Sequence, residues 1–198
     1  MFPRPLLLLG QPRAGTVLLG SLLACHPAVE IARDELVVSA RRPHQALDRL
    51  RLAHRGRHVG VRLDPAALAG RNASSWLHVA SHRGWLVVHV QRGDTLRHEL
   101  AHRPRPVYDV DPAVLLPALR LRAERNLQER ADLLGVEHVR LSYEDDLDAP
   151  LAWQATADRV LAALGLGSVP VSTRLPHQPD RPLEHLVGNA AELLAALS

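Results

Sequence analysis

Short apolar runs alternate with longer segments of helical spacing along this chain. Four runs have the length of buried β-strands, and residues with helical periodicity separate each run from the next. These four runs are Leu6–Leu9, His58–Leu63, Leu86–Gln91 and Glu137–Leu141. The alternation predicts a central parallel sheet flanked by helices, which is an α/β fold.

Apolar faces at helical spacing and clusters of Pro and Arg divide the rest of the chain. The faces predict a helix around Leu47, Leu50 and His54, a longer one through Leu115, Leu119, Arg122 and Asn126 between Pro112 and Gly135, and another over Leu151–Leu164. Three segments are expected to be loops: Arg41–Pro43, Arg103–Val107 and Val169–Pro182. With 198 residues and 46% apolar content, we expect a single domain over residues 1–198.

The first apolar run leads into a loop bounded by Gly10 and Gly15 and then into an amphipathic helix. Glycine lets the backbone turn and approach an anion closely, and the N–H groups that open the helix at Thr16 point toward that anion. The layout predicts a phosphate cradle, against the alternative of a plain glycine turn. The pattern G-x-x-x-x-G-K-[ST] is matched without its lysine, and Arg13 lies inside the loop. This favours a ligand with one terminal anionic group over nucleoside triphosphate hydrolysis.

Composition excludes some classes of protein. All 24 basic residues are arginines, the net charge is +3, and the arginines are dispersed. Only 3% of the residues are aromatic, so nucleic-acid binding is disfavoured. A single cysteine, Cys25, fits a reducing compartment. Because the apolar run at the start is too short for a membrane span, a cytoplasmic protein is expected.

Ligands of open parallel sheets bind beyond the carboxyl ends of the strands. This rule predicts a common rim formed by the residues that follow the strands. The rim segments are Gln11–Thr16, Arg62–Asp64, Arg92–Thr95 and Ser142–Asp145. Tyr143, Glu144 and Asp145 are expected to form a turn and a cap that shape this rim.

Four blocks resemble the sulfotransferases that use 3′-phosphoadenosine 5′-phosphosulfate (PAPS). The segment Gln11–Leu19 is similar to the family's P-R-[ST]-G-[ST]-T-L-L loop, and Trp85–Ala101 is similar to its second signature, a strand that ends in Arg followed by a helix. Ser142–Asp145 with the helix ending at Gly165 resembles the Y-E-D-L segment and its helix, and Gln178–Leu197 resembles the C-terminal tail.

The resemblance implies a three-layer P-loop-like fold and sulfuryl transfer from PAPS to a hydroxyl group, without a metal. The acceptor would be a small molecule, a glycan or a molecule bound to a carrier. The loop would hold the 5′-phosphosulfate through Arg13 and Thr16, and Arg92 would hold the 3′-phosphate. The full set of candidate donor-binding residues is Gln11, Pro12, Arg13, Ala14, Gly15, Thr16, Val17, Arg92, Arg97, Arg174 and Gln178.

In-line transfer needs a general base opposite the leaving phosphate. Glu35 is the candidate, because it follows the first helix and a short strand around Val29–Ile31, in a segment that resembles the family's acidic G-E-L stretch. Other candidates are Asp34, Glu30 and His44. Arg13 would act as the second catalytic residue by stabilising charge on the sulfuryl oxygens and on the leaving phosphate.

The chain departs from the family pattern at several positions. The serine that binds the 3′-phosphate falls on Ala101 or Leu100, the second loop threonine is Val17, and the loop at Arg103–Val107 is short. His98 or His102 is a possible replacement donor. These departures leave open a degenerate member that binds a nucleotide or a partner without catalysis.

Two further enzyme classes compete. His98–His102 reads H-E-x-x-H, a zinc-hydrolase motif, but Pro104 follows directly and Glu124 is the only Glu at a plausible downstream distance. A P-loop kinase is the other alternative and would require magnesium and ATP binding.

Overall fold

The computed structural model describes residues 3–35, 43–54, 56–68, 73–101, 109–175 and 182–197. Its centre is a five-stranded parallel sheet with the strand order β2-β3-β1-β4-β5. The strands are β1 (Leu6–Leu9), β2 (Val29–Glu35), β3 (His58–Leu63), β4 (Leu86–Gln91) and β5 (His138–Ser142). The α/β class and the parallel sheet predicted from the sequence are therefore confirmed.

The four consecutive leucines of β1 occupy the middle of the sheet. All four are buried, because β3 pairs on one side, β4 pairs on the other, and helices cover both faces. Leu6 and Leu8 belong to one core cluster, and Leu7 and Leu9 belong to a second cluster on the opposite face. A parallel strand covered on both faces reads as a continuous apolar run, which explains the run in the sequence.

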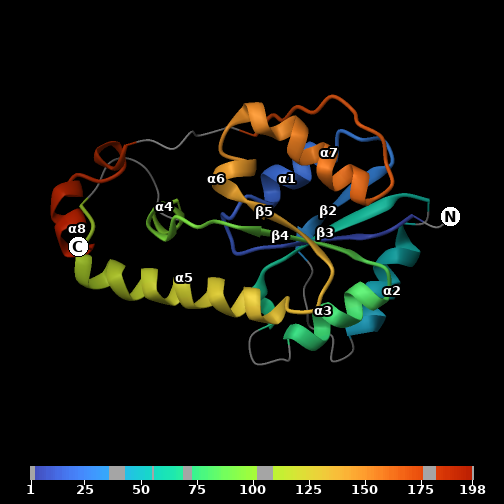
Figure 1. The fold of residues 1–198 in the computed structure, drawn as a ribbon, viewed down its shortest axis with the longest axis horizontal. Coiled ribbons are helices and arrows are strands. Elements are labelled where there is room, and N and C mark those ends of the chain that lie inside the picture. The colour runs from blue at the N-terminus through green and yellow to red at the C-terminus, as the bar shows by residue number, and fades with distance from the viewer. Residues whose placement is uncertain are drawn as a thin grey trace.

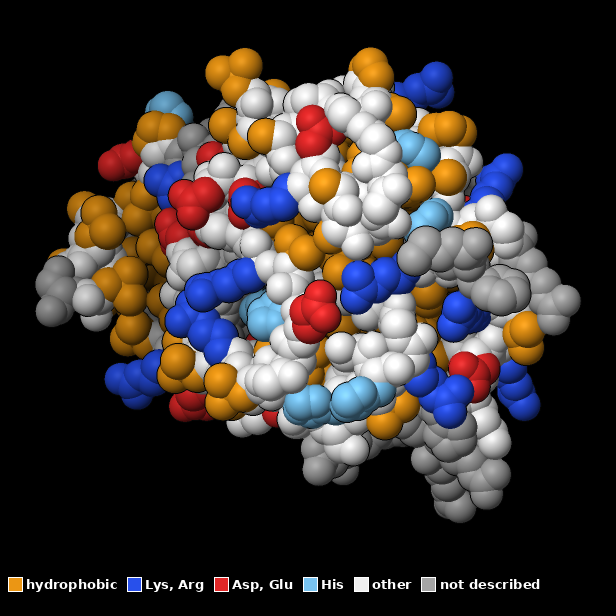
Figure 2. All heavy atoms as spheres, turned by 45° about the vertical axis from the view of Figure 1, so that its right-hand side comes forward, with side chains coloured by type: hydrophobic (Ala, Val, Ile, Leu, Met, Phe, Trp, Pro, Cys, Tyr) orange, Lys and Arg blue, Asp and Glu red, His pale blue; other side chains and the backbone are white. Residues whose placement is uncertain are grey.

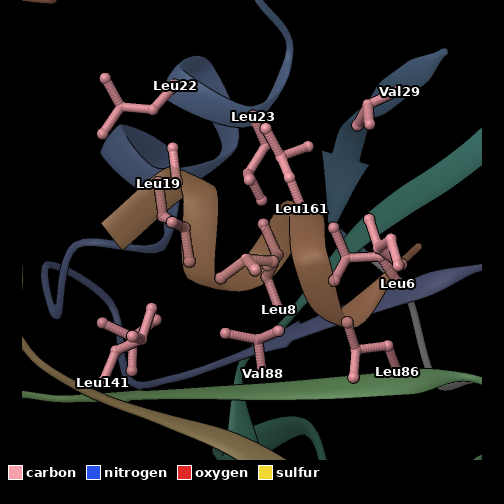
Figure 3. Close-up of a cluster of buried hydrophobic side chains, with 14 of the residues drawn as sticks. Leu6, Leu8, Leu19, Leu22, Leu23, Val29, Leu86, Val88, Leu141 and Leu161 are labelled. Carbon is pink, nitrogen blue, oxygen red and sulfur yellow. The ribbon is translucent and has the colours of Figure 1, made fainter. Parts of the chain in front are cut away.

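Helices form a layer on each face of the sheet (Figure 1). One layer contains α1 (Thr16–Leu23), α6 (Tyr143–Asp146) and α7 (Trp153–Ala163), and the other contains α2 (Pro43–Ala53), α3 (Ala73–His82) and α5 (Pro112–Asp132). Figure 3 shows the core between the first layer and the sheet, where Leu19 and Leu161 pack over Leu8 and Val88. The three-layer arrangement is thus present.

A smaller apolar cluster lies away from the sheet. It joins α4 (Thr95–Leu100), the first half of α5, and α8 (Ala190–Leu197). Asp111 caps α5 by accepting a hydrogen bond from the Ala113 amide, and Pro112 takes the first helical position. The cluster anchors the start of α5, so that its second half runs beneath the sheet (Figure 1).

Element boundaries differ from the predicted ones at four places. Pro43, expected to end a loop, is the first residue of α2, while the predicted loop Arg103–Val107 lies outside the described residues. The strand predicted to start at Glu137 runs from His138 to Ser142, and the short strand expected around Val29–Ile31 extends to Glu35 through a register shift against β3. The helix predicted from Leu151 begins at Trp153, after a 3-10 turn over Pro150–Ala152. Among the described residues, no helix combines the length and apolarity needed to cross a bilayer.

Candidate functional site

The predicted rim exists at the carboxyl ends of the strands. The loop after β1 is tied to β3, because the Gly10 amide donates to the Leu63 carbonyl at 3.2 Å. The loop turns through two residues in left-handed backbone conformations, Arg13 with φ of 69° and Gly15 with φ of 109°. A non-glycine residue with positive φ is uncommon, so Arg13 is held in an unusual conformation at the tip of the loop.

Both glycines of the loop are required by their surroundings. A Cβ atom at Gly10 would lie 2.6 Å from the Val90 carbonyl oxygen, and one at Gly15 would lie 2.8 Å from Leu147 Cδ1 and 2.9 Å from Tyr143 Cδ2. The loop is therefore pressed against β4 on one side and against the start of α6 on the other. These two contacts explain why glycine is found at both positions.

The N-terminus of α1 has no side-chain cap and no acidic residue in its first turn. Thr16 is buried at the opening of the helix, while Arg13 is exposed and makes no hydrogen bond or ion pair within the described part of the chain. Uncapped amides at the positive end of a helix dipole, with a guanidinium beside them, favour an anion. The loop thus suits the terminal anionic group expected from the sequence.

Arg92 follows β4 on the same rim. It is only 7% exposed, and its guanidinium carbon lies 4.2 Å from the centre of the Tyr143 ring, a cation–π contact. Arg97, one turn into α4, pairs with Asp94 through its Nε at 3.2 Å. The structure therefore fixes Arg92 beside the loop and directs Arg97 toward its own helix cap.

Glu144 clamps the chain that follows β4. Its carboxylate accepts hydrogen bonds from the amides of Gly93 at 3.2 Å and Asp94 at 3.0 Å and from the Ser142 hydroxyl at 3.0 Å. Burial acts to raise the pKa of Glu144, but these hydrogen bonds and its own amide outweigh burial and leave the pKa below its usual value. The predicted capping segment thus holds the rim together.

The candidate base is on the strand that borders a hollow beside α1. Glu35 is the last residue of β2 and pairs with Arg62 of β3 after a register shift, although the structure does not describe its side chain, nor those of Asp34 and His44. Arg62 lines a hollow of about 240 Å³. The other lining residues are Val17, Gly20, Ser21, Ala24, Ile31, Ala32 and Leu175.

The remaining acidic candidate is engaged elsewhere. Glu30 stands near the start of β2, far along the strand from Glu35, and its carboxylate pairs with His54 at 3.2 Å and with Arg57 at 3.9 Å. The amino end of a parallel strand faces away from the rim. Glu30 is therefore poorly placed to act as the general base.

The segment before residue 176 returns to the outer side of α1. Thr173 and Ser21 are joined by a hydrogen bond of 2.8 Å between their hydroxyl groups, and Arg174 follows as an exposed residue. Gln178 lies outside the described residues. Of these two candidates, the structure thus brings Arg174 to the segment that lies beside α1.

The first two residues of the H-E-x-x-H motif make polar contacts in the described structure. His98 is buried, and its Nε2 lies 2.8 Å from the Pro12 carbonyl oxygen, while Glu99 pairs with Arg122 at 2.8 Å; His102 lies outside the described residues. No group of three or more His, Cys, Asp and Glu residues that could hold a metal ion is found in the described ranges. The engagement of His98 with the loop argues against a zinc role for this motif.

Sequence reasoning missed the polar residues of α5 that reach the rim. Asn126 is buried and accepts a hydrogen bond from Gln11 Nε2 at 2.8 Å, and Arg122 donates to Gln11 Oε1 at 3.2 Å. Both residues belong to the periodic face that predicted the helix. Arg122 and Asn126 are polar residues on the face of the helix that is expected to pack inward. Their presence on that face was the sequence signal for a buried polar contact.

Comparison with known proteins finds similarity only at the level of structure. No protein-family model matches the chain, and no curated protein matches it. A sulfotransferase from Alicyclobacillus acidocaldarius aligns with a TM-score of 0.57 and 16% identity, covering 98% of this chain and 94% of that one. The sulfotransferase domain of the Synechococcus PCC 7002 olefin synthase aligns with a TM-score of 0.52 and 14% identity, over 98% and 87% of the two chains.

A kinase shares the same architecture. Shikimate kinase from Bacteroides thetaiotaomicron aligns with a TM-score of 0.52 and 11% identity, over 82% of this chain and 98% of that one. Likeness at such identities establishes the fold and leaves the chemistry to the site. The resemblance noted in the sequence is thereby supported by structure: the chain has the P-loop-like α/β fold that these sulfotransferases share with shikimate kinase.

Proposed function

We propose that this chain is a sulfotransferase that moves the sulfuryl group of PAPS to a hydroxyl group of a small molecule, a glycan or a carrier-bound acceptor. The observation that carries the proposal is the loop after β1. It combines an uncapped helix N-terminus with Arg13 and lacks the lysine that phosphate loops of kinases use. The four sequence blocks that resemble the family, and the shared fold, support the same proposal.

The donor site consists of two arms on one rim. In the first arm, the amides of Thr16 and its neighbours and the guanidinium of Arg13 bind the 5′-phosphosulfate. In the second arm, Arg92 binds the 3′-phosphate, with its guanidinium held against the Tyr143 ring. Arg97, Arg174 and Gln178 complete the set as sequence-based candidates.

The acceptor takes the hollow beside α1. Apolar residues such as Val17, Ile31 and Leu175 line it, and Arg62 brings a positive charge to it. Glu35 pairs across the sheet with Arg62, which is one of the lining residues. Glu35 accepts the acceptor proton as the hydroxyl oxygen attacks sulfur, and Arg13 stabilises the charge that develops on the leaving phosphate.

Phosphoryl transfer from ATP is the competing chemistry for this fold. Kinases and NTPases that use this kind of loop depend on its lysine and on a bound magnesium ion, and the chain contains no lysine. The arginine at the loop tip has no direct counterpart in that motif. ATP with magnesium is therefore the proper control ligand.

The test is transfer of labelled sulfur from PAPS to a broad panel of hydroxyl acceptors. We expect wild type to label at least one acceptor, Glu35→Gln to reduce turnover by about 10²-fold or more, and Arg13→Ala to reduce it by a similar factor. Asp34→Asn is the matched control, because it changes the neighbouring carboxylate, and it should retain most of the activity. Binding of the donor without transfer to any acceptor would instead indicate the degenerate, non-catalytic alternative.

A further inference from the structure

A polar network links α5 to both arms of the rim. On the inner face of α5, Arg122 and Asn126 are one helical turn apart and reach the loop after β1 and the end of β4. This face is apolar at Leu115 and Leu119 and becomes polar where it passes the rim. Burying a polar side chain lowers stability unless the side chain is hydrogen-bonded. The polar residues on this face of α5 are therefore expected to have specific hydrogen-bond partners.

Arg122 hydrogen-bonds two partners at once. Its Nε and Nη2 bind Glu99 Oε2 at 3.1 and 2.8 Å, and its Nη1 donates to Gln11 Oε1 at 3.2 Å. The pair is sheltered, since Arg122 is 10% exposed and Glu99 is 17% exposed. A planar guanidinium that is hydrogen-bonded on two sides has little rotational freedom. Arg122 can therefore hold the residues that it bonds in fixed positions.

His98 extends this contact to the next residue of the loop. Its Nε2 lies 2.8 Å from the Pro12 carbonyl oxygen and 3.1 Å from Arg122 Nη1. A carbonyl can only accept, so Nε2 carries the proton and donates it to Pro12. Arg122 Nη1 is also a donor, so it packs against His98 without a hydrogen bond. Two consecutive residues, Gln11 and Pro12, are therefore tied to α4 and α5 just before the left-handed turn at Arg13.

Asn126 connects the same helix to the second arm. It accepts from Gln11 Nε2 at 2.8 Å and donates its own Nδ2 to the Arg92 carbonyl at 3.2 Å. One amide side chain thus joins the backbone of Arg92 to the loop that carries Arg13. The distance between the two arms depends on α5.

We propose that Arg122 is a positioning residue, which sets the backbone of the loop at Gln11–Arg13 and, through Gln11 and Asn126, its position relative to Arg92. The effect of this role on donor binding rests on the proposed function: Arg122 preorganises the donor site. Preorganised groups bind an anion without the cost of ordering them first. His98 and Glu99, the first two residues of the H-E-x-x-H motif, thus help to hold the loop in place.

The experiment measures loop order and donor-product affinity separately. Amide hydrogen exchange is followed at Gly10, Ala14 and Leu19, whose amides are hydrogen-bonded in or beside the loop. The buried strands β1 and β4 are the internal reference, and the proteins compared are wild type, Arg122→Leu and Arg122→Lys. Lysine keeps the charge but lacks the planar fork, so both variants lose the simultaneous contacts. Arg125→Leu, an exposed arginine on the same helix, is the matched control.

We expect exchange at Gly10, Ala14 and Leu19 to rise about tenfold in both Arg122 variants, relative to the strand amides, and affinity for the desulfated product PAP to fall about tenfold. The Arg125 variant should match wild type. A folded Arg122→Lys variant whose loop amides exchange at the wild-type rate would overturn the proposal. This result would decide the question even if Arg122→Leu does not fold. If wild type does not bind PAP, the proposed function fails, while the exchange ratio still decides the role of Arg122.

Discussion

Gly10 is the residue whose replacement is most informative for the loop. A methyl group there would lie 2.6 Å from the Val90 carbonyl oxygen and 3.0 Å from Thr16 Cγ2, so backbone must move. We expect Gly10→Ala to lower the free energy of unfolding by about 1–3 kcal/mol, as overpacking does elsewhere, and to weaken anion binding because the loop shifts.

Gly167→Ala is the matched control for that measurement. A Cβ there meets nothing within 4 Å, and its φ is not in the left-handed range. Thermal and urea unfolding should therefore show that Gly10→Ala is clearly less stable than Gly167→Ala. Equal stability of both variants would contradict the tight contact between the loop and β4.

Glu144 gives the rim a pH dependence. Its pKa is lowered in the folded protein, so ionised Glu144 stabilises the fold above its unfolded pKa, and this contribution is lost as the pH falls through the folded pKa. We expect Glu144→Gln to be less stable than wild type near pH 7, with the difference shrinking in acid below about pH 4. Urea unfolding at a series of pH values measures this difference.

Asp145→Asn is the control for the Glu144 experiment. Asp145 is the exposed neighbour of Glu144, and the amides of Gly93 and Asp94 bond to Glu144. This control should show little pH-dependent change in stability. A Glu144→Gln variant that keeps a constant deficit from pH 7 to pH 3 would show that the carboxylate charge does not matter.

At the scale of elements, α7 packs against α1 and thereby supports the helix that follows the loop after β1. Leu161 is fully buried on α7, in the cluster that contains Leu19 and Leu22 of α1 (Figure 3). We expect Leu161→Ala to lower the free energy of unfolding by about 2–5 kcal/mol. Chemical denaturation measures the loss.

Leu151→Ala makes the same chemical change at a site that is 96% exposed, just before α7. Its stability should lie within about 0.5 kcal/mol of wild type. Comparable losses in the two variants would mean that α7 does not pack as described.

Sequence periodicity was sufficient for most strands and for the location of the loop. The runs Leu6–Leu9, His58–Leu63 and Leu86–Gln91 coincide with β1, β3 and β4, because buried parallel strands are continuously apolar. Periodicity could not give the strand order or the partners of polar residues. The contacts of Arg122 with Gln11 and of Glu144 with Gly93 join residues far apart in the chain, so only the three-dimensional structure reveals them.

At the scale of the whole molecule, the fold alone does not choose between sulfuryl and phosphoryl transfer. Both sulfotransferases and a kinase share it, and the choice rests on a few residues of the rim. Figure 2 shows arginine side chains at several places on one face, interspersed with acidic ones. A dispersed net charge of +3 is too small to specify a ligand, so the proposed function assigns that task to Arg13 and Arg92.

The most direct test of this account is a calorimetric titration of the metal-analysed protein with PAP. Wild type and Arg120→Ala, an exposed arginine on α5, should bind PAP saturably at one site. Arg13→Ala and Arg92→Ala should each lose about tenfold or more in affinity, since each removes a charge-assisted contact to phosphate. Absence of PAP binding by folded wild type, or equal affinity in all four proteins, would contradict the donor site described above.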